Sequence, residues 1–254
     1  MDETLSQATA TATVARKSTR RSALLAGALS VAILVATAVT TGQHAARAAV
    51  LDLGAAPVPG LDTGNTIPLD ELGDFVVEDL NAYWTTSFAN AGLEYIPTEI
   101  IYFEIDVFSG CGYQLAEIGP FYCGTDGLIY LPGEFFVGDI RTQDFAVAVI
   151  IAHEVGHHVQ NLVGISAAKE AGTITTMQSE LQADCLAGVW TADIDSRGGL
   201  EAGDYGEALT VLDSIGDDAL GVPAGEGDHG NSVDRLAWFE FGYAVANGSE
   251  CVTY

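Results

Sequence analysis

The residues best suited to chemistry lie close together in one apolar stretch. Positions 153–157 read His-Glu-Val-Gly-His, which places two histidines four residues apart. On a helix, positions i and i+4 share a face, so both imidazoles can bind one metal ion. Glu154 lies one step round the helix, where its carboxylate can take a proton from a water activated by that metal. The motif therefore predicts a metal-dependent hydrolytic centre, provided that the segment is helical.

The surrounding sequence predicts that helix. Residues 144–163 form a long apolar run without proline, with Thr142 as a candidate N-cap and Gly164 at the end. Placing two imidazoles and a carboxylate in so apolar a helix costs several kcal/mol unless they find partners. A bound metal ion satisfies all three groups.

A second pair of carboxylates supplies the missing ligand. Glu180 and Asp184 are again four residues apart on a predicted helix, 179–193, which is apolar around them. Catalytic zinc commonly takes two histidines and one glutamate, with water in the fourth position. We expect Glu180 to be the third ligand, and Asp184 to accept a hydrogen bond from a ligating imidazole. The alternative is that both acids lie on a solvated helix edge, as most acids do.

The chain resembles the bacterial neutral zinc metallopeptidases. The resemblance rests on HEVGHHVQ (153–160), ELQADCLAGVW (180–190), the block 111–131, the block 207–218 and HGNSVDRLAWFEFG (229–242). It implies a zincin-like, gluzincin-type catalytic domain that binds one Zn²⁺ per chain. The implied ligands are His153, His157 and Glu180, with Glu154 as the general base and Asp184 behind the ligands. It also implies retention of a single membrane-spanning helix.

His229 is a further candidate catalytic residue. Its spacing from Arg235, H-x5-R, is similar to that of another membrane gluzincin family, in which a late histidine faces the reacting carbonyl oxygen. A donor there would stabilise the developing oxyanion. The alternative is a helix-capping or surface histidine in a Gly-rich loop. His158, by contrast, lies about 100° round the helix from His157, and we expect it to pack or hydrogen-bond instead of binding the metal.

The coarse fold prediction is α+β, mainly helical with a small sheet, in one domain spanning 69–254. Hydrophobic periodicity predicts helices at 70–90, 144–163, 179–193, 204–214 and 233–243, and strands at 99–107 and 127–131. We expect the second strand to lie at a sheet edge, where it could pair with an extended substrate. Residues 43–68 read as a linker.

The N-terminal segment predicts that the chain is exported. Residues 22–42 carry no charge and follow a basic segment, 1–21, which favours a signal peptide or a single transmembrane helix. The sequence Ala46-Arg47-Ala48 offers a cleavage site near Ala48, whereas 21 uncharged residues are enough to span a bilayer. Both alternatives place the rest of the chain outside the cytoplasm, either anchored to the membrane or secreted.

The number and spacing of the cysteines also favour export. The four cysteines contain no C-x-x-C pair, and two disulfides are the default in an oxidising compartment. We favour Cys111–Cys123 with Cys185–Cys251, because the first pair closes a short local loop. The alternative is buried free thiols.

Composition narrows the choice of partners. The chain has 35 acidic and 9 basic residues, a formal net charge of −26, which argues against nucleic acid as a partner. The predicted function is zinc-dependent hydrolysis of peptide bonds in a peptide or protein substrate outside the cytoplasm. The alternatives are a zinc-stabilised envelope module that binds a partner without cutting it, and an amidase that acts on cell-wall crosslinks.

Overall fold

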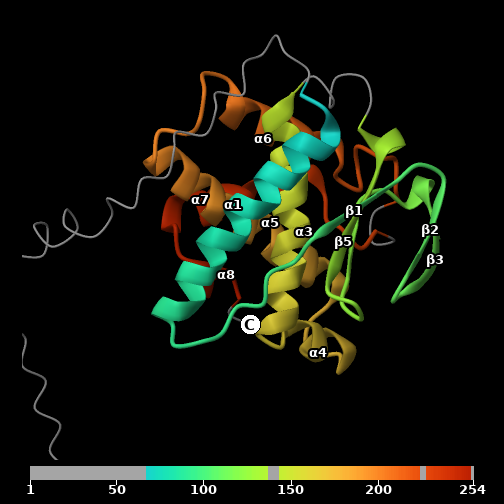
Figure 1. Cartoon of the computed structure of the whole chain (residues 1–254), viewed down its shortest axis with the longest axis horizontal. Coiled ribbons are helices and arrows are strands. Elements are labelled where there is room, and N and C mark those ends of the chain that lie inside the picture. Colours follow the sequence, from blue (N-terminus) through green and yellow to red (C-terminus); the bar gives the residue numbers. More distant parts are fainter. Residues whose placement is uncertain (1–66, 137–142, 224–226, 253–254) are drawn as a thin grey trace, which may run out of the picture. The chain divides into compact units, whose positions relative to one another are not determined.

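The computed structural model describes residues 67–136, 143–223 and 227–252 (Figure 1). The hydrophobic segment 22–42, its flanks and Thr142 lie outside these ranges, so the predicted signal or anchor and the predicted N-cap stay predictions. None of the helices in the described ranges has the length and hydropathy needed to cross a bilayer.

The described part is mainly helical with a small sheet, which confirms the α+β prediction. All five predicted helices are present, α6 with the predicted bounds and the other four with shifted ends. The helices are α1 (Leu69–Asn90), α3 (Asp144–Leu162), α4 (Ile165–Glu170), α5 (Thr176–Ser196), α6 (Asp204–Ser214), α7 (Ser232–Val245) and α8 (Gly248–Cys251). Gly164 follows α3 with a left-handed φ of 85°, as expected for a helix stop. Figure 1 shows α3 running through the middle of these helices, and its residues 145–156 are all buried.

The predicted strand 99–107 is in fact two strands. β1 (Ile100–Phe103) pairs in parallel with β5 (Leu128–Pro132), whereas β2 (Asp106–Ser109) pairs antiparallel with β3 (Gly112–Leu115) in a separate hairpin. The chain bends at residues 104–105 because its two halves have different hydrogen-bonding partners. Strand propensity along the sequence does not reveal such a change of partner.

The prediction that 127–131 forms an edge strand is wrong. The sheet order is β1-β5-β4, so β5 lies in the centre, parallel to β1 and antiparallel to β4 (Phe121–Cys123). Ile129, Tyr130 and Leu131 are buried, which suits a central strand. Both edges of β5 are occupied, and a substrate cannot pair with its backbone.

The predicted disulfide pairing is confirmed. Cys111 bonds Cys123, which ties the β2–β3 hairpin to β4, and Cys185 bonds Cys251, which ties α5 to α8. All four cysteines are therefore used. A crosslink between residues 66 positions apart restricts the unfolded chain strongly.

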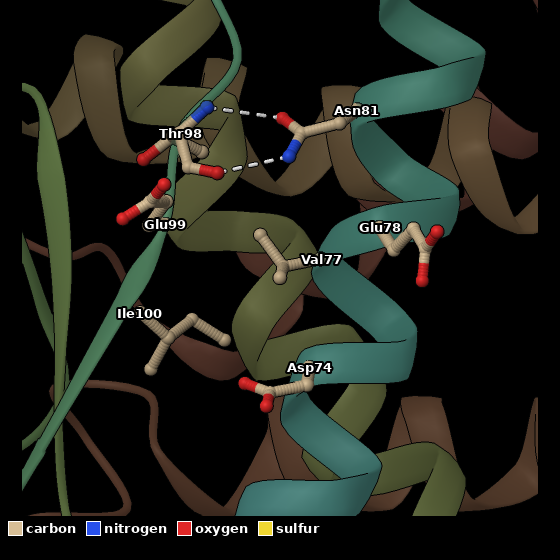
Figure 2. Close-up of a pocket in the computed structure, with 7 residues that line it drawn as sticks. All are labelled: Asp74, Val77, Glu78, Asn81, Thr98, Glu99 and Ile100. Atoms are coloured by element: carbon tan, nitrogen blue, oxygen red, sulfur yellow. Dashed lines mark hydrogen bonds between the residues drawn. The ribbon is translucent and has the colours of Figure 1, made fainter.

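Helix α1 is joined to the start of the sheet by an amide. Figure 2 shows Asn81 on α1 accepting a hydrogen bond from the Thr98 backbone N–H at 3.1 Å and donating to the Thr98 carbonyl at 2.9 Å. These residues line a pocket of about 340 Å³, to which three acids also contribute. None of its lining residues belongs to the metal-binding motif.

Two glycines allow α5 and α7 to pack with their backbones in contact. A Cβ on Gly188 would collide with the carbonyl oxygen of Phe239, and a Cβ on Gly242 would collide with the carbonyl oxygen of Cys185. The obstacles are backbone atoms, which cannot move aside as a side chain could. The pairing of α5 with α7 therefore depends on glycine at both positions.

We expect Gly242→Ala to lower the free energy of unfolding by about 1–3 kcal/mol, because the added methyl group overpacks a backbone contact. Gly206→Ala in α6 is the matched control: no atom lies within 4 Å of its Cβ position, and alanine favours a helix. Urea denaturation followed by circular dichroism measures both. Equal midpoints for Gly242→Ala and the wild type would contradict this account of the packing.

Candidate metal centre

Three side chains from two helices converge on one point. The Oε2 atom of Glu180 on α5 lies 3.2 Å from Nε2 of His153 and 3.3 Å from Nε2 of His157, both on α3. The two imidazole rings are nearly perpendicular, with centroids 4.7 Å apart. One donor atom from each residue lies within 4.8 Å of the other two, a spacing that can hold a metal ion.

The close approach of α3 and α5 makes this convergence geometrically feasible. A Cβ on Gly156, between the two histidines, would lie 3.0 Å from the Cα and the carbonyl oxygen of Ala183. Ala183 in turn lies between Glu180 and Asp184 on α5. Small residues on both helices thus bring the backbones together at the level of the site.

Asp184 orients the first histidine. Nδ1 of His153 lies 2.8 Å from Oδ1 of Asp184, a fully buried carboxylate. Because a carboxylate accepts, the imidazole carries a proton on Nδ1, so Nε2, which faces Glu180, is the nitrogen that can bind a metal ion. The sequence prediction of this contact agrees with the structure.

Arg235 on α7 is the second side chain that hydrogen-bonds to the carboxylate of Asp184. Its Nε donates to Oδ2 of Asp184 at 2.9 Å and its Nη2 to Oδ1 at 2.8 Å, while Nη1 donates to the carbonyl of Ile215. A two-pronged guanidinium contact of this kind balances the buried charge. The H-x5-R spacing associates Arg235 with His229, whereas in the structure Arg235 contacts Asp184.

Gln160 orients the second histidine, a role that the sequence analysis missed. Nδ1 of His157 lies 2.9 Å from Oε1 of Gln160, and the amide nitrogen of Gln160 donates to the carbonyl of Ser179 and to Gln182. The amide nitrogen is thus committed as a donor, so its oxygen accepts the imidazole proton. The available signal was an amide three positions after His157 in an otherwise apolar helix.

The electrostatics favour charged carboxylates. Burial raises the pKa of Glu180, but the two adjacent imidazoles outweigh it and hold that pKa well below its usual range. Burial likewise raises the pKa of Asp184, and Arg235 followed by His153 lowers it overall. Burial lowers the pKa of His153, while Asp184 and then Glu180 raise it overall. The site therefore provides anionic oxygens ready to share a cation.

His158 stays outside the centre, as the sequence predicts. Its Nδ1 lies 3.1 Å from the hydroxyl of Tyr122, and its Nε2 lies 2.6 Å from the carbonyl of Ile96. Burial lowers its pKa. The ring joins α3 to β4 and to the chain before β1.

The three converging side chains line a pocket of about 530 Å³. Glu154, adjacent to His153, also lines it, and so do Phe121 and Tyr122 of β4. His229 also lines the pocket, with its side chain 57% exposed, and its Nδ1 is 3.3 Å from Oδ1 of Asp217. His229 is not the helix cap, because Asn231 caps α7.

Comparison with known proteins identifies the family. Residues 19–254 match the sequence profile of the family described as "Putative neutral zinc metallopeptidase". The chain belongs to this family. No solved structure matches it.

Two relatives share about a third of the aligned residues with this chain. The uncharacterized protein YpfJ of Escherichia coli K12 is 35% identical over 191 residues, which cover 67% of this chain and 66% of YpfJ. The chain thus spans just under two thirds of that relative's length. The uncharacterized protein Rv2575 of Mycobacterium tuberculosis H37Rv is 34% identical over 178 residues, or 60% of each chain.

The donor set fits the metal in the family's name. Two neutral imidazole nitrogens and one carboxylate oxygen are the usual protein ligands of catalytic zinc. Both imidazoles have an acceptor on Nδ1, which leaves Nε2 free for a metal. The residues present are therefore suited to Zn²⁺ by chemistry and by geometry.

We expect Gln160→Leu to weaken zinc affinity about 10–100-fold, because His157 loses the acceptor that fixes its proton on Nδ1. Gln114→Leu on β3 is the matched control, since Gln114 contributes to neither the donor group nor the pocket. Competition against a fluorescent zinc chelator measures both affinities. Equal zinc affinity in the two variants would show that Gln160 does not orient the ligand.

Proposed function

We propose that this chain is a zinc-dependent peptidase that hydrolyses peptide bonds outside the cytoplasm. The observation that carries the proposal is the convergence of His153, His157 and Glu180 in an open pocket beside Glu154. In this proposal the three converging residues hold the metal. When bound, zinc supplies a Lewis acid that polarises a carbonyl and lowers the pKa of a water molecule toward neutrality.

Glu154 acts in this proposal as the general base. Its side chain is buried but borders the pocket, and no described residue hydrogen-bonds to its carboxylate. The carboxylate is thus available to accept a proton from water and to return it to the leaving amine. Its neighbours on α3 are fixed by Asp184 and Gln160, so the base keeps its position relative to the histidines.

The proposal includes an oxidising compartment and a peptide or protein substrate. Two disulfides that use all four cysteines fit an oxidising compartment. The 530 Å³ pocket is walled partly by apolar and aromatic residues of β4 and neighbouring turns, which suits side chains of a peptide. A peptide or protein substrate is the proposed partner.

We expect Glu154→Gln to abolish peptidase activity while keeping about one zinc per chain, because the amide has no basic oxygen but leaves the metal ligands intact. Glu78→Gln on α1 is the matched control, since Glu78 is exposed and lies outside the metal pocket. The measurements are cleavage of a fluorogenic peptide, with and without chelator, and elemental analysis. Undiminished turnover by the zinc-loaded Glu154→Gln variant would refute the mechanism.

His229 stabilises the developing oxyanion in this proposal. Asp217 accepts hydrogen bonds from the backbone N–H groups of His229 and Gly230 at 3.1 and 2.9 Å, so the loop holding the imidazole is fixed at the pocket wall. Over half of the side chain remains exposed and can face a substrate.

We expect His229→Ala to lower kcat by about 10²–10³ without loss of zinc, the usual effect of removing one oxyanion donor. Steady-state kinetics with elemental analysis tests this, with His229→Gln to restore part of the activity through its amide donor. A kcat near the wild-type value in His229→Ala would assign the residue to the surface.

A further inference from the structure

A second group of carboxylates lies where α3 and α6 begin. Asp144 is the first residue of α3, and Asp204 and Glu207 lie in the first turn of α6. One carboxylate oxygen from each lies within 4.8 Å of the other two. None of these residues belongs to the candidate metal centre or lines its pocket.

The hydrogen bonds of this trio leave one buried oxygen without a partner. The backbone N–H of Phe145 donates to Oε2 of Glu207 at 3.2 Å and to Oδ1 of Asp144 at 2.8 Å. Oδ2 of Asp204 accepts from the backbone of Glu201, but its Oδ1 is buried and has no hydrogen-bond partner. Asp204 is only 1% exposed. An unsatisfied buried carboxylate oxygen costs free energy, so this oxygen is available to a ligand that would lower that cost.

Nothing in the described protein neutralises the trio. Every ion pair of Arg197 and Arg235 is with another acid, and no described cation pairs with these three residues. The two helix N-termini contribute roughly half a positive charge each, so the described residues leave about two of the three negative charges unbalanced. A divalent cation would match that remainder.

Burial, together with repulsion between neighbouring acids, raises the pKa values of these carboxyl groups. Burial, with the charges of Asp204 and Glu201, raises the pKa of Asp144 to about 6. Burial also raises the pKa of Asp204, and burial with the charge of Asp144 raises that of Glu207. Carboxylates that resist ionisation in the cation-free protein are those that a bound cation would stabilise.

We propose that Asp144, Asp204 and Glu207 form a calcium site that joins the start of α3 to the start of α6. Three carboxylates supply about three to six of the oxygens that Ca²⁺ takes, and water can supply the rest. The three side chains offer only oxygen ligands and none of the nitrogen ligands that zinc favours. The site would fix the end of the helix that carries His153 and His157, and it does not depend on the proposed peptidase activity.

The test compares the zinc-loaded full chain with its Asp204→Asn variant in calcium-free buffer and after addition of CaCl₂. We expect calorimetry to give one Ca²⁺ per wild-type chain at this site, with affinity lowered at least tenfold in Asp204→Asn. The melting temperature of the wild type should rise with calcium and saturate. Without calcium, Asp204→Asn should melt no lower than the wild type, because it removes repulsion. With calcium, it should melt lower.

Asp213→Asn is the matched control, an exposed acid on the same helix that should respond to calcium as the wild type does. Equal calcium responses in the wild type and Asp204→Asn would overturn the proposal, because the ion would then bind elsewhere on this acidic chain. The absence of any calcium response would overturn it too. Addition of MgCl₂ at the same ionic strength distinguishes binding at a specific calcium site from general screening of the acidic surface. An equal rise in melting temperature with Mg²⁺ would also contradict a calcium-specific site.

Discussion

The carboxylate of Asp184 is the contact on which the rest of the centre depends. It is fully buried on α5, and it receives His153 from α3 and Arg235 from α7. Removing one member of such a buried, charge-balanced group typically costs about 3–5 kcal/mol, because the remaining charges lose their partners. This interaction therefore fixes an imidazole for metal binding and holds three helices together at the same time.

Close backbone packing allows those polar groups to meet. Gly156 brings α3 against Ala183 of α5, while Gly188 and Gly242 bring α5 against α7. Larger residues at these positions would separate the helices and lengthen every hydrogen bond between them. The ligands can therefore converge only because the glycines let the helix backbones approach closely, although the glycines themselves bind no metal.

Much of this centre could be predicted from the sequence because its information is local. The spacing of His153 and His157 defines a shared helix face, and the same holds for Glu180 and Asp184. Helix positions follow from hydrophobic periodicity, which explains why α6 has the predicted bounds. The sheet was harder to predict, since β5 became central only through hydrogen bonds to two separate earlier segments, β1 and β4.

By itself, the sequence determined the ligand types, their helical spacing, the positions of the cysteines and the excess of acidic residues. Only the tertiary structure decided that Arg235 contacts Asp184 and that Asp144 meets Asp204 and Glu207. The physical reason is the range of the interactions. Periodicity and spacing act within a few turns of one helix, whereas these contacts depend on how separate helices cross and on how closely their backbones approach.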